Sequence, residues 1–209
     1  MTMYVPPHFR QSDTAAMQAA MRDIAFASLV SHGEHGLTAS HVPLLLDAAR
    51  GPYGVLRGHL ARANMQARQK PDQALAIFLG PQGYISPGWY AAKREHGKVV
   101  PTWNYIAVHA SGPLRWIEDG EALLAIVRDL TEHHEAGLPA PWRVSDAPAD
   151  FIAGMLRGII GFELEIADLQ GKWKLSQNRS PADIAGGIAG LRGQGADGLA
   201  DAMEETSGH

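Results

Sequence analysis

The order of β-prone and helix-prone segments is the feature that most constrains the fold of this chain. Alternating apolar segments cluster early, and the two clearest helical patterns, 121–135 and 146–160, come later. The strict alternation of strand and helix that a doubly wound parallel sheet requires is absent. The sequence therefore predicts a mainly β fold of the α+β class, an antiparallel barrel of about five or six strands with peripheral helices.

Turn-forming residues set the boundaries of the predicted elements. Strands are expected over residues 26–31, 37–46, 55–61, 74–79, 99–117, 162–166 and 173–175. Helices are expected after a cap at Ser12 or Asp13, around 64–69, and over 121–135, 146–160 and 181–191. Residues 80–98 should be largely loop. Residues 1–192 are expected to form one domain, and residues 193–209 a loose tail.

The composition limits the classes of function. The 209 residues include no cysteine, which removes disulfides, thiolate nucleophiles and Fe–S clusters. The ten histidines include no HExxH pattern, and we expect no metal site. No signal peptide or membrane-length apolar stretch is visible, so a cytoplasmic protein without a membrane partner is expected. The net charge of −4, without a long Lys/Arg run, argues against nucleic acid as the main ligand.

The segment LRGHLARAN at residues 56–64 carries the most suggestive polar pattern. On a strand, Arg57 and His59 share one face, and Arg62 and Asn64 lie at the strand exit. A forked guanidinium and an amide at that position could hold a phosphate. The alternative is a solvated strand end that carries two arginines.

Three further segments supply groups that a cofactor could use. The hydroxyls of Thr38 and Ser40 share one strand face and could bond a phosphate, a ring carbonyl or water. Residues 98–105 combine two aromatic rings and an amide, which suits a flat heterocycle, although Trp103 would serve equally well in a core. Residues 171–179 repeat this pattern with more charge. Neither GxGxxG nor a P-loop occurs, so strand and loop side chains would have to hold any phosphorylated cofactor.

Taken together, these segments resemble the PaiB family of FMN-binding negative transcriptional regulators. The similar motifs are YVPPHF at 4–9, LRGHLARAN at 56–64, YISPGWY at 84–90, KVVPTWNY at 98–105, SDAPADF at 145–151 and GKWKLSQNR at 171–179. They occur in the family's order over nearly the whole chain. The resemblance implies an FMN-binding split β-barrel, like that of pyridoxamine-phosphate oxidases. It also implies a homodimer with FMN in the cleft between subunits.

The resemblance also identifies candidate FMN-binding residues. They are Ser40, His41, Arg57, His59, Arg62, Asn64, Thr102, Trp103, Asn104, Lys174, Gln177 and Asn178. The motif at 56–64 would serve the phosphate and ribityl chain, and the motif at 98–105 the edge of the ring. The last three residues would reach the cofactor from the partner subunit. Ser40 stands where the family often has asparagine.

Three functions agree with this resemblance. The first is an FMN-binding regulator that senses flavin or redox state. The second is an FMN-dependent oxidoreductase acting on a small organic substrate, with His41, His59 and Tyr105 as unranked proton donors. The third is a DNA-binding repressor, for which residues 181–191 are a poor recognition helix because they are almost uncharged and contain Gly186 and Gly187. The catalytic residues and the enzymatic status stay open.

Overall fold

The structure, a computed structural model, describes residues 3–208, and their contacts divide them into two compact units. The first unit contains Thr14–Phe78 and His109–Leu169. The second contains residues 3–13, Leu79–Val108 and residues 170–208. The long strands β6 (Gln73–Ile85) and β7 (Thr102–Ile117) contribute residues to both units, where the sequence analysis expects a single domain.

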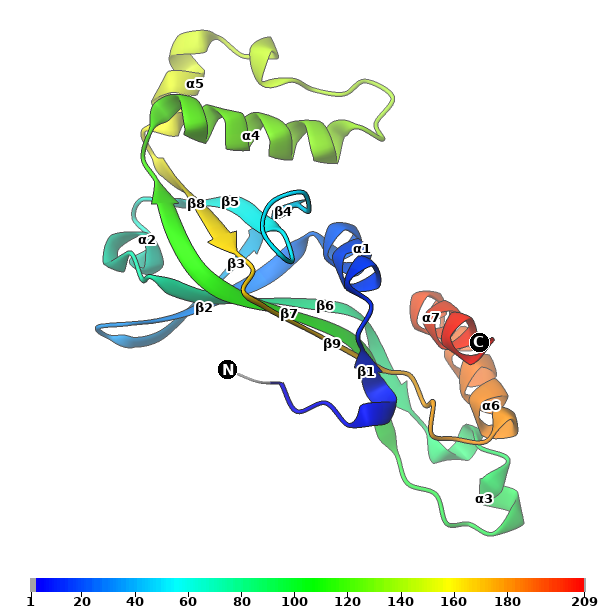
Figure 1. Cartoon of the computed structure of the whole chain (residues 1–209). Helices are drawn as coiled ribbons and strands as arrows, with labels where there is room; N and C mark the ends of the chain where they lie inside the picture. The colour runs from blue at the N-terminus through cyan, green and yellow to red at the C-terminus, as the bar shows by residue number, and fades with distance from the viewer. Residues whose placement is uncertain (1–2, 209) are drawn as a thin grey trace. The chain divides into compact units, whose positions relative to one another are not determined.

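The first unit is built on antiparallel strands (Figure 1). The sheet order is β3-β2-β6-β7-β8-β5-β4. Besides parts of β6 and β7, its elements are α1 (Thr14–Ile24), β2 (Phe26–Gly33), β3 (Gly36–Pro43), β4 (Leu45–Asp47), β5 (Val55–Ala61), α2 (Met65–Gln69), α4 (Gly120–Glu135), η3 (Val144–Asp146), α5 (Ala149–Leu156) and β8 (Ile159–Glu165). This arrangement confirms the predicted mainly β fold with peripheral helices.

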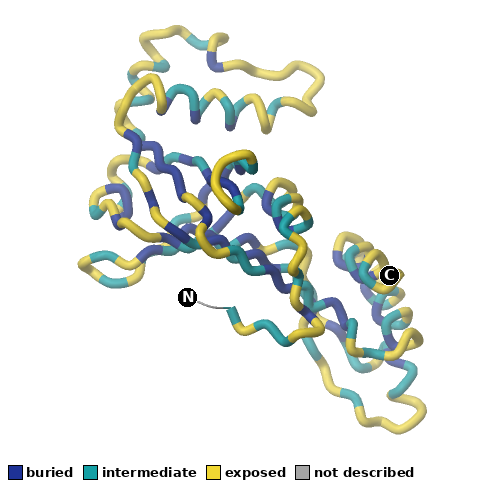
Figure 2. Tube along the Cα trace, viewed as in Figure 1, coloured by how far each residue is buried: buried dark blue, intermediate teal, exposed yellow. Residues whose placement is uncertain are grey.

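Strands β5 and β8 pair along their whole length, from Val55 opposite Glu165 to Ala61 opposite Ile159. Side chains alternate between the two faces of each strand, and Figure 2 shows the resulting concentration of buried residues in these strands. Gly58 allows close packing at its position, because a Cβ there would lie 2.8 Å from a methyl group of Leu44 and 3.0 Å from the ring of Phe162. The close approach of these side chains fixes the register of the pair.

Helix α4 covers one face of this sheet. Its N-cap, Asp119, accepts a hydrogen bond from the backbone N–H of Ala122 at 2.9 Å. Leu123, Ile126 and Leu130 recur at helical spacing and are buried. The last two pack with Ile117 in one apolar cluster. The helix predicted over 121–135 is therefore confirmed.

The second unit holds a separate apolar cluster. Its elements, besides parts of β6 and β7, are η1 (Pro7–Phe9), β1 (Arg10–Gln11), η2 (Pro87–Trp89), α3 (Ala92–Glu95), most of β9 (Asp168–Lys174), α6 (Pro181–Arg192) and α7 (Asp197–Ser207). Helix α7 buries Leu199, Ala200 and Met203 in a cluster with Leu191 of α6. The expectation of a loose tail is therefore wrong for Asp197–Ser207, because this segment presents an apolar stripe that α6 covers.

Three other boundaries differ from the prediction. Strand β6 continues to Ile85 despite Gly80 and Pro81, since it pairs with β7 in the sheet. The predicted strand 37–46 is divided into β3 and β4. The predicted helix 146–160 is replaced by η3, α5 and the start of β8 at Ile159, because sheet pairing of Ile159 and Ile160 outweighs their helical spacing.

Among residues 3–208, no helix has both the length and the apolar character needed to cross a membrane.

A buried carboxylate on β8 carries the strongest charge interactions of the first unit. Glu163 is 8% exposed and accepts two hydrogen bonds from Arg50, at 2.8 and 2.9 Å, and one from Arg115 at 2.6 Å. The hydrogen bonds from Arg50 lower the pKa of Glu163 from 4.5 to about 2. Arg115 adds to this lowering, and burial opposes it. The pair of arginines thus joins β8 to β7 and to the turn before β5.

We expect Glu163→Gln to lower the free energy of unfolding by about 2–3 kcal/mol at pH 7, since it removes a paired carboxylate and leaves Arg50 unpaired. A carboxylate with a lowered pKa stabilises the fold above its ordinary pKa and loses this effect as pH falls through the folded value. The difference between variant and wild type should therefore shrink between pH 4.5 and about 2. Urea unfolding at several pH values measures it. Glu165→Gln, on the exposed end of β8, is the control, and an equal loss there would contradict the assignment.

Candidate functional site

Two of the predicted residues, Ser40 and Asn64, are in contact where β3 and the start of α2 meet. The amide Nδ2 of Asn64 donates a hydrogen bond to Ser40 Oγ at 2.8 Å. The other side of this amide caps α2, because its Oδ1 accepts from the backbone N–H of Gln66 at 2.9 Å. His41 follows Ser40 on β3, and Arg62 precedes Asn64 by two residues. We call Ser40, Asn64 and Arg62 the first cluster, and His41 points to the opposite face of β3 from Ser40.

The first cluster rests on a buried amide that the sequence reasoning missed. Gln66 is 1% exposed, and its Nε2 donates to the backbone carbonyl of Leu29 at 3.0 Å and to Ser31 Oγ at 2.8 Å. These bonds tie α2 to β2 and fix the position of Asn64. The sequence could not reveal Gln66, because a glutamine inside a short polar helix carries no signal of burial.

His41 occupies an exposed position on β3. Its Nδ1 lies 3.0 Å from the hydroxyl of Ser28, the residue directly opposite on β2. The rings of Phe26 and His41 are stacked with centroids 6.4 Å apart. The sheet register, which the sequence did not provide, brings Ser28 into this arrangement.

The surface around His41 is apolar. Residues directly opposite in antiparallel strands share a face, and this face of β3, β2 and β6 carries Phe26, Val30, Leu37, Ala39, Leu75 and Ile77. We call these six residues the outer apolar face. None of them is buried, and Phe26 and Leu37 are 58% and 70% exposed. Exposed apolar patches of this kind mark interaction surfaces.

Arg62 lies just past the end of β5. Its side chain is 41% exposed, and its closest carboxylate is Glu118 at 3.8 Å. Glu118 also pairs with Lys70, whose hydrogen bond lowers the pKa of this carboxyl. Because Glu118 is shared between two cations, the Arg62 guanidinium keeps donors free for a further anion.

Arg57 and His59 lie on the face of β5 that α4 covers. The Nη1 of Arg57 donates to Asp129 of α4 at 2.7 Å, so this guanidinium already has a carboxylate partner. Burial lowers the pKa of His59, and its Nδ1 has no hydrogen-bond partner among residues 3–208. Neither side chain bonds to a member of the first cluster. The structure therefore separates these two residues from the other candidates on LRGHLARAN.

A second cluster in the other unit contains Thr102, Trp103 and Lys174. The Nζ of Lys174 donates to Thr102 Oγ1 and to the backbone carbonyl of Trp103, both at 2.5 Å. The indole of Trp103 is 49% exposed, and its edge meets the ring of Tyr84, with centroids 6.5 Å apart. Trp103 is thus a surface platform rather than a core residue.

Positive charge collects around the second cluster. Burial lowers the pKa of Lys174, and repulsion from Lys172 and Arg179 lowers it further. Lys172 lies over the ring of Tyr105 at 5.3 Å, and Arg179 over the ring of Tyr90 at 5.0 Å. An anion bound near these three cations would relieve their mutual repulsion.

The remaining candidates of this unit have different environments. Gln177 bonds within its own turn, since its Nε2 donates to the carbonyl of Trp173 at 2.6 Å and its Oε1 accepts from the N–H of Leu175 at 2.8 Å. Asn178 is exposed. Asn104 is fully buried, and its Oδ1 has no partner among residues 3–208.

Comparison with known proteins identifies the class to which this fold and these clusters belong. A family model described as "Putative FMN-binding domain" matches residues 3–168. The chain is 31% identical to the protease synthase and sporulation protein PAI 2 of Bacillus subtilis, with 97% of each chain covered. It is 32% identical to an uncharacterized protein of Aspergillus fumigatus, again with 97% of each covered. The chain belongs to the PaiB family of FMN-binding proteins.

Solved structures with little sequence identity share the fold. The flavocytochrome Anf3 of Azotobacter vinelandii matches with a TM-score of 0.59 at 13% identity, over 81% of this chain and 72% of that one. An FAD- and heme-binding protein of Mycobacterium smegmatis matches with a TM-score of 0.59 at 14% identity, over 85% and 80%. The predicted split-barrel fold is confirmed, and FMN is the cofactor that the family assigns to this chain.

The donor set of both clusters fits FMN. A phosphate and a ribityl chain need hydroxyl, amide and guanidinium groups, which Ser40, Asn64 and Arg62 present. A flavin ring needs an aromatic or apolar platform with a few polar groups at its edge, which Trp103, Thr102 and Lys174 provide. Among the described residues, no group of three His, Asp or Glu side chains has the arrangement of a metal site.

Ser176 holds the turn that carries Gln177 and Asn178. It is 4% exposed, has a left-handed φ of 70°, and its Oγ accepts a hydrogen bond from Asn104 Nδ2 at 2.9 Å. A left-handed backbone strains every residue except glycine. The buried hydrogen bond therefore holds a strained turn beside the second cluster.

We expect Ser176→Ala to destabilise the protein more than Ser176→Gly does, by about 1 kcal/mol. Both variants lose the hydroxyl and leave the Asn104 amide short of a partner, but glycine adopts the left-handed backbone without strain. Urea unfolding of the two variants measures the difference. The reverse order of stability would show that strain at this φ is unimportant.

Proposed function

We propose that this chain is an FMN-binding regulator that acts as a homodimer and responds to the presence or redox state of its flavin. The observation that carries the proposal is the hydrogen bond between Ser40 and Asn64, which holds a hydroxyl and an amide together, while Arg62, two residues before Asn64, keeps guanidinium donors free. In this proposal Ser40, Arg62 and Asn64 hold the FMN phosphate and ribityl chain. FMN, when bound, supplies the capacity to accept and release electrons.

The second cluster supports the ring end of the same ligand. Trp103 offers an exposed aromatic face, and Thr102 and Lys174 offer polar groups at its edge. Burial lowers the pKa of Lys174 most, and repulsion from Lys172 and Arg179 lowers it further, so the positive charge of these three residues favours an electron-rich ligand. We propose that Lys174, Gln177 and Asn178 contact the FMN held by the first cluster of the other subunit.

The outer apolar face supports the homodimer. Exposed apolar area costs about 25 cal/mol per Å² relative to burial, so covering Phe26, Leu37 and their neighbours stabilises an assembly. His41 stands inside this face, directly after Ser40. A dimer formed through this face covers His41, whereas the side chain of Ser40 points to the other face of β3.

Regulation through direct contact of α6 with DNA has little support. Two glycines of this helix allow Trp89 to pack closely against it. A Cβ at Gly186 would lie 2.1 Å from the carbonyl oxygen of Trp89, and a Cβ at Gly190 would lie 2.2 Å from its indole. Helix α6 is thus a packing helix, and the chain carries a net charge of −4. We propose that the regulatory signal passes through the flavin. Salt-dependent binding of DNA to the purified protein would contradict this.

Replacing Arg62 with alanine should weaken FMN binding by roughly 1.5–3 kcal/mol, the scale of a hydrogen bond to a charged group. Titration of flavin fluorescence with the folded variant measures the change. Arg68→Ala, which removes an exposed arginine of α2 six residues away in the sequence, is the matched control and should bind FMN as the wild type does. Unchanged affinity in Arg62→Ala would remove Arg62 from the site.

The dimer is tested by a charge placed in the outer apolar face. We expect light scattering of the wild type to give twice the 22.5 kDa of the chain, and Val30→Lys to give a monomer that releases FMN. Burying an unpaired ammonium in an apolar interface opposes association. Leu138→Lys, at an exposed position after α4, should leave both mass and flavin unchanged. FMN retained by a monomer would rule out a shared site.

The oxidoreductase function is the second candidate, and the exposure of His41 favours it. Its ring is open to solvent and bonded to Ser28, so it is placed to donate or accept a proton beside the first cluster. Reoxidation of reduced FMN with turnover of a small organic substrate would establish this function. Reoxidation by dioxygen alone, without a substrate, would favour the regulator.

A further inference from the structure

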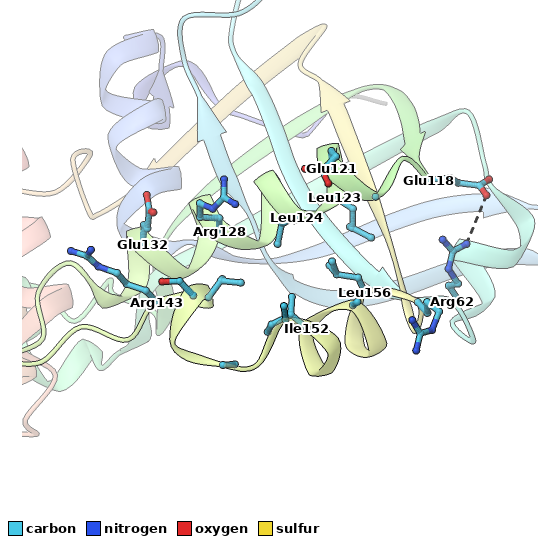
Figure 3. A pocket seen from close by; sticks show the side chains of 17 residues that line it. Arg62, Glu118, Glu121, Leu123, Leu124, Arg128, Glu132, Arg143, Ile152 and Leu156 are labelled. Carbon is cyan, nitrogen blue, oxygen red and sulfur yellow. Dashed lines mark ion pairs between the residues drawn. The ribbon is translucent and has the colours of Figure 1, made fainter.

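Helix α4 and the chain that follows it enclose a groove of about 910 Å³ within the first unit (Figure 3). Leu123 and Leu124 of α4 face Ile152 and Leu156 of α5 across it, and Val144 of η3 completes the apolar lining. The volume falls in the range of roughly 300–1,000 Å³ that small-molecule sites occupy. Ser40, His41 and Asn64 do not line this groove.

The α5 side of the groove is apolar but poorly buried. Between residues 136 and 158, Val144 is the single buried position. Helix α5 buries none of its residues, although it carries Phe151, Ile152, Met155 and Leu156. A surface helix ordinarily buries one apolar stripe against its own chain. Here the stripe of Ile152 and Leu156 faces the groove and is only half-buried.

The charged residues around the groove favour an anion. Four arginines, Arg62, Arg128, Arg143 and Arg157, and three glutamates, Glu118, Glu121 and Glu132, line it, a balance of four positive against three negative charges. Glu118 is neutralised by Arg62 and Lys70. Arg128, Arg143 and Arg157 form no ion pair with any residue between 3 and 208.

The unpaired charges lie beside the apolar lining. In Figure 3, Arg128 and Arg143 stand with Glu132 at the end of the groove opposite Arg62 and Glu118. That end carries two guanidinium groups and one carboxylate, so it keeps a positive charge. A guanidinium binds a carboxylate through two parallel hydrogen bonds, which gives such an end both charge and directional donors.

We propose that this groove binds an amphipathic organic anion, a molecule with one carboxylate head and an apolar chain. The apolar chain of this ligand lies on Leu124, Ile152 and Leu156, and its carboxylate pairs with Arg128 and Arg143. Such a ligand would cover the half-buried apolar surface of α5 and pair with the two arginines that form no ion pair within residues 3–208. The groove shares Arg62 with the first cluster, but the proposed carboxylate site at Arg128 and Arg143 lies at its other end, and binding there does not require FMN.

Sodium dodecanoate below its micelle concentration is the probe, titrated calorimetrically into the full chain. We expect one dodecanoate per chain, and at least tenfold weaker binding by the double variant Arg128→Gln/Arg143→Gln, equivalent to about 1.4 kcal/mol. Dodecanol, which has the same chain without the charge, should also bind at least tenfold more weakly. Ile152→Glu should abolish binding, because it places a carboxylate on the apolar wall.

Two control variants separate the groove from the rest of the surface. Arg22→Gln removes an exposed arginine of α1, and Phe151→Ser changes the side of α5 that does not line the groove. Both should bind dodecanoate as the wild type does. Circular dichroism confirms that each variant is folded. Absence of binding by the wild type, equal binding by the double variant, or equal binding of dodecanol would overturn the proposal. If the wild type binds dodecanoate but not FMN, the result contradicts the proposed function and leaves the proposal for the groove intact.

Discussion

The pairing of β5 with β8 is the interaction on which the first unit depends. It joins segments that are distant in the sequence over the full length of both strands. One side of the pair supplies core residues that close around Gly58 and Phe162. The other side supplies the charged layer of Arg57 and Glu163 beneath α4. Just beyond the end of β5, Asn64 donates a hydrogen bond to Ser40. A slip of one residue in this register would exchange the two sides and remove all three features.

The local patterns of the sequence predicted the elements whose shape depends on local periodicity. The helix at 121–135 and the helix at 181–191 appear within a residue or two of their predicted bounds. The prediction was wrong where long-range pairing outweighs local preference. Ile159 and Ile160 continue a helical spacing, but their pairing with Ala61 and Leu60 places them in β8. Gly80 and Pro81 resemble a loop, but β7 holds them within β6. No local signal reports such a partner.

The candidate FMN site shows the same difference between features that local sequence reports and features that depend on long-range contacts. Ser40 and Asn64 were each named as candidate FMN-binding residues from the resemblance, but their hydrogen bond was not predicted. The pairing of Arg57 with Asp129 could not be predicted from the sequence, because it depends on how α4 packs on the sheet. Ser28, Gln66 and Ser176 were missed for a related reason: each acts through a residue that is remote in the sequence or through an unusual backbone angle. Spacing along the chain carries neither kind of information.

The position of His41 links the proposed interface to the proposed cofactor site. A partner that covers the outer apolar face also removes water from this imidazole, and an unpartnered ring nitrogen would then cost free energy. The hydroxyl of Ser28 supplies a partner for Nδ1 from within the same chain, so the apolar face can be covered without leaving that nitrogen unsatisfied. The Nε2 edge has no such internal partner among the described residues, and it is the edge left for a ligand or a second subunit. One pair of side chains thus lets a single sheet face be apolar enough to associate and polar enough to bind.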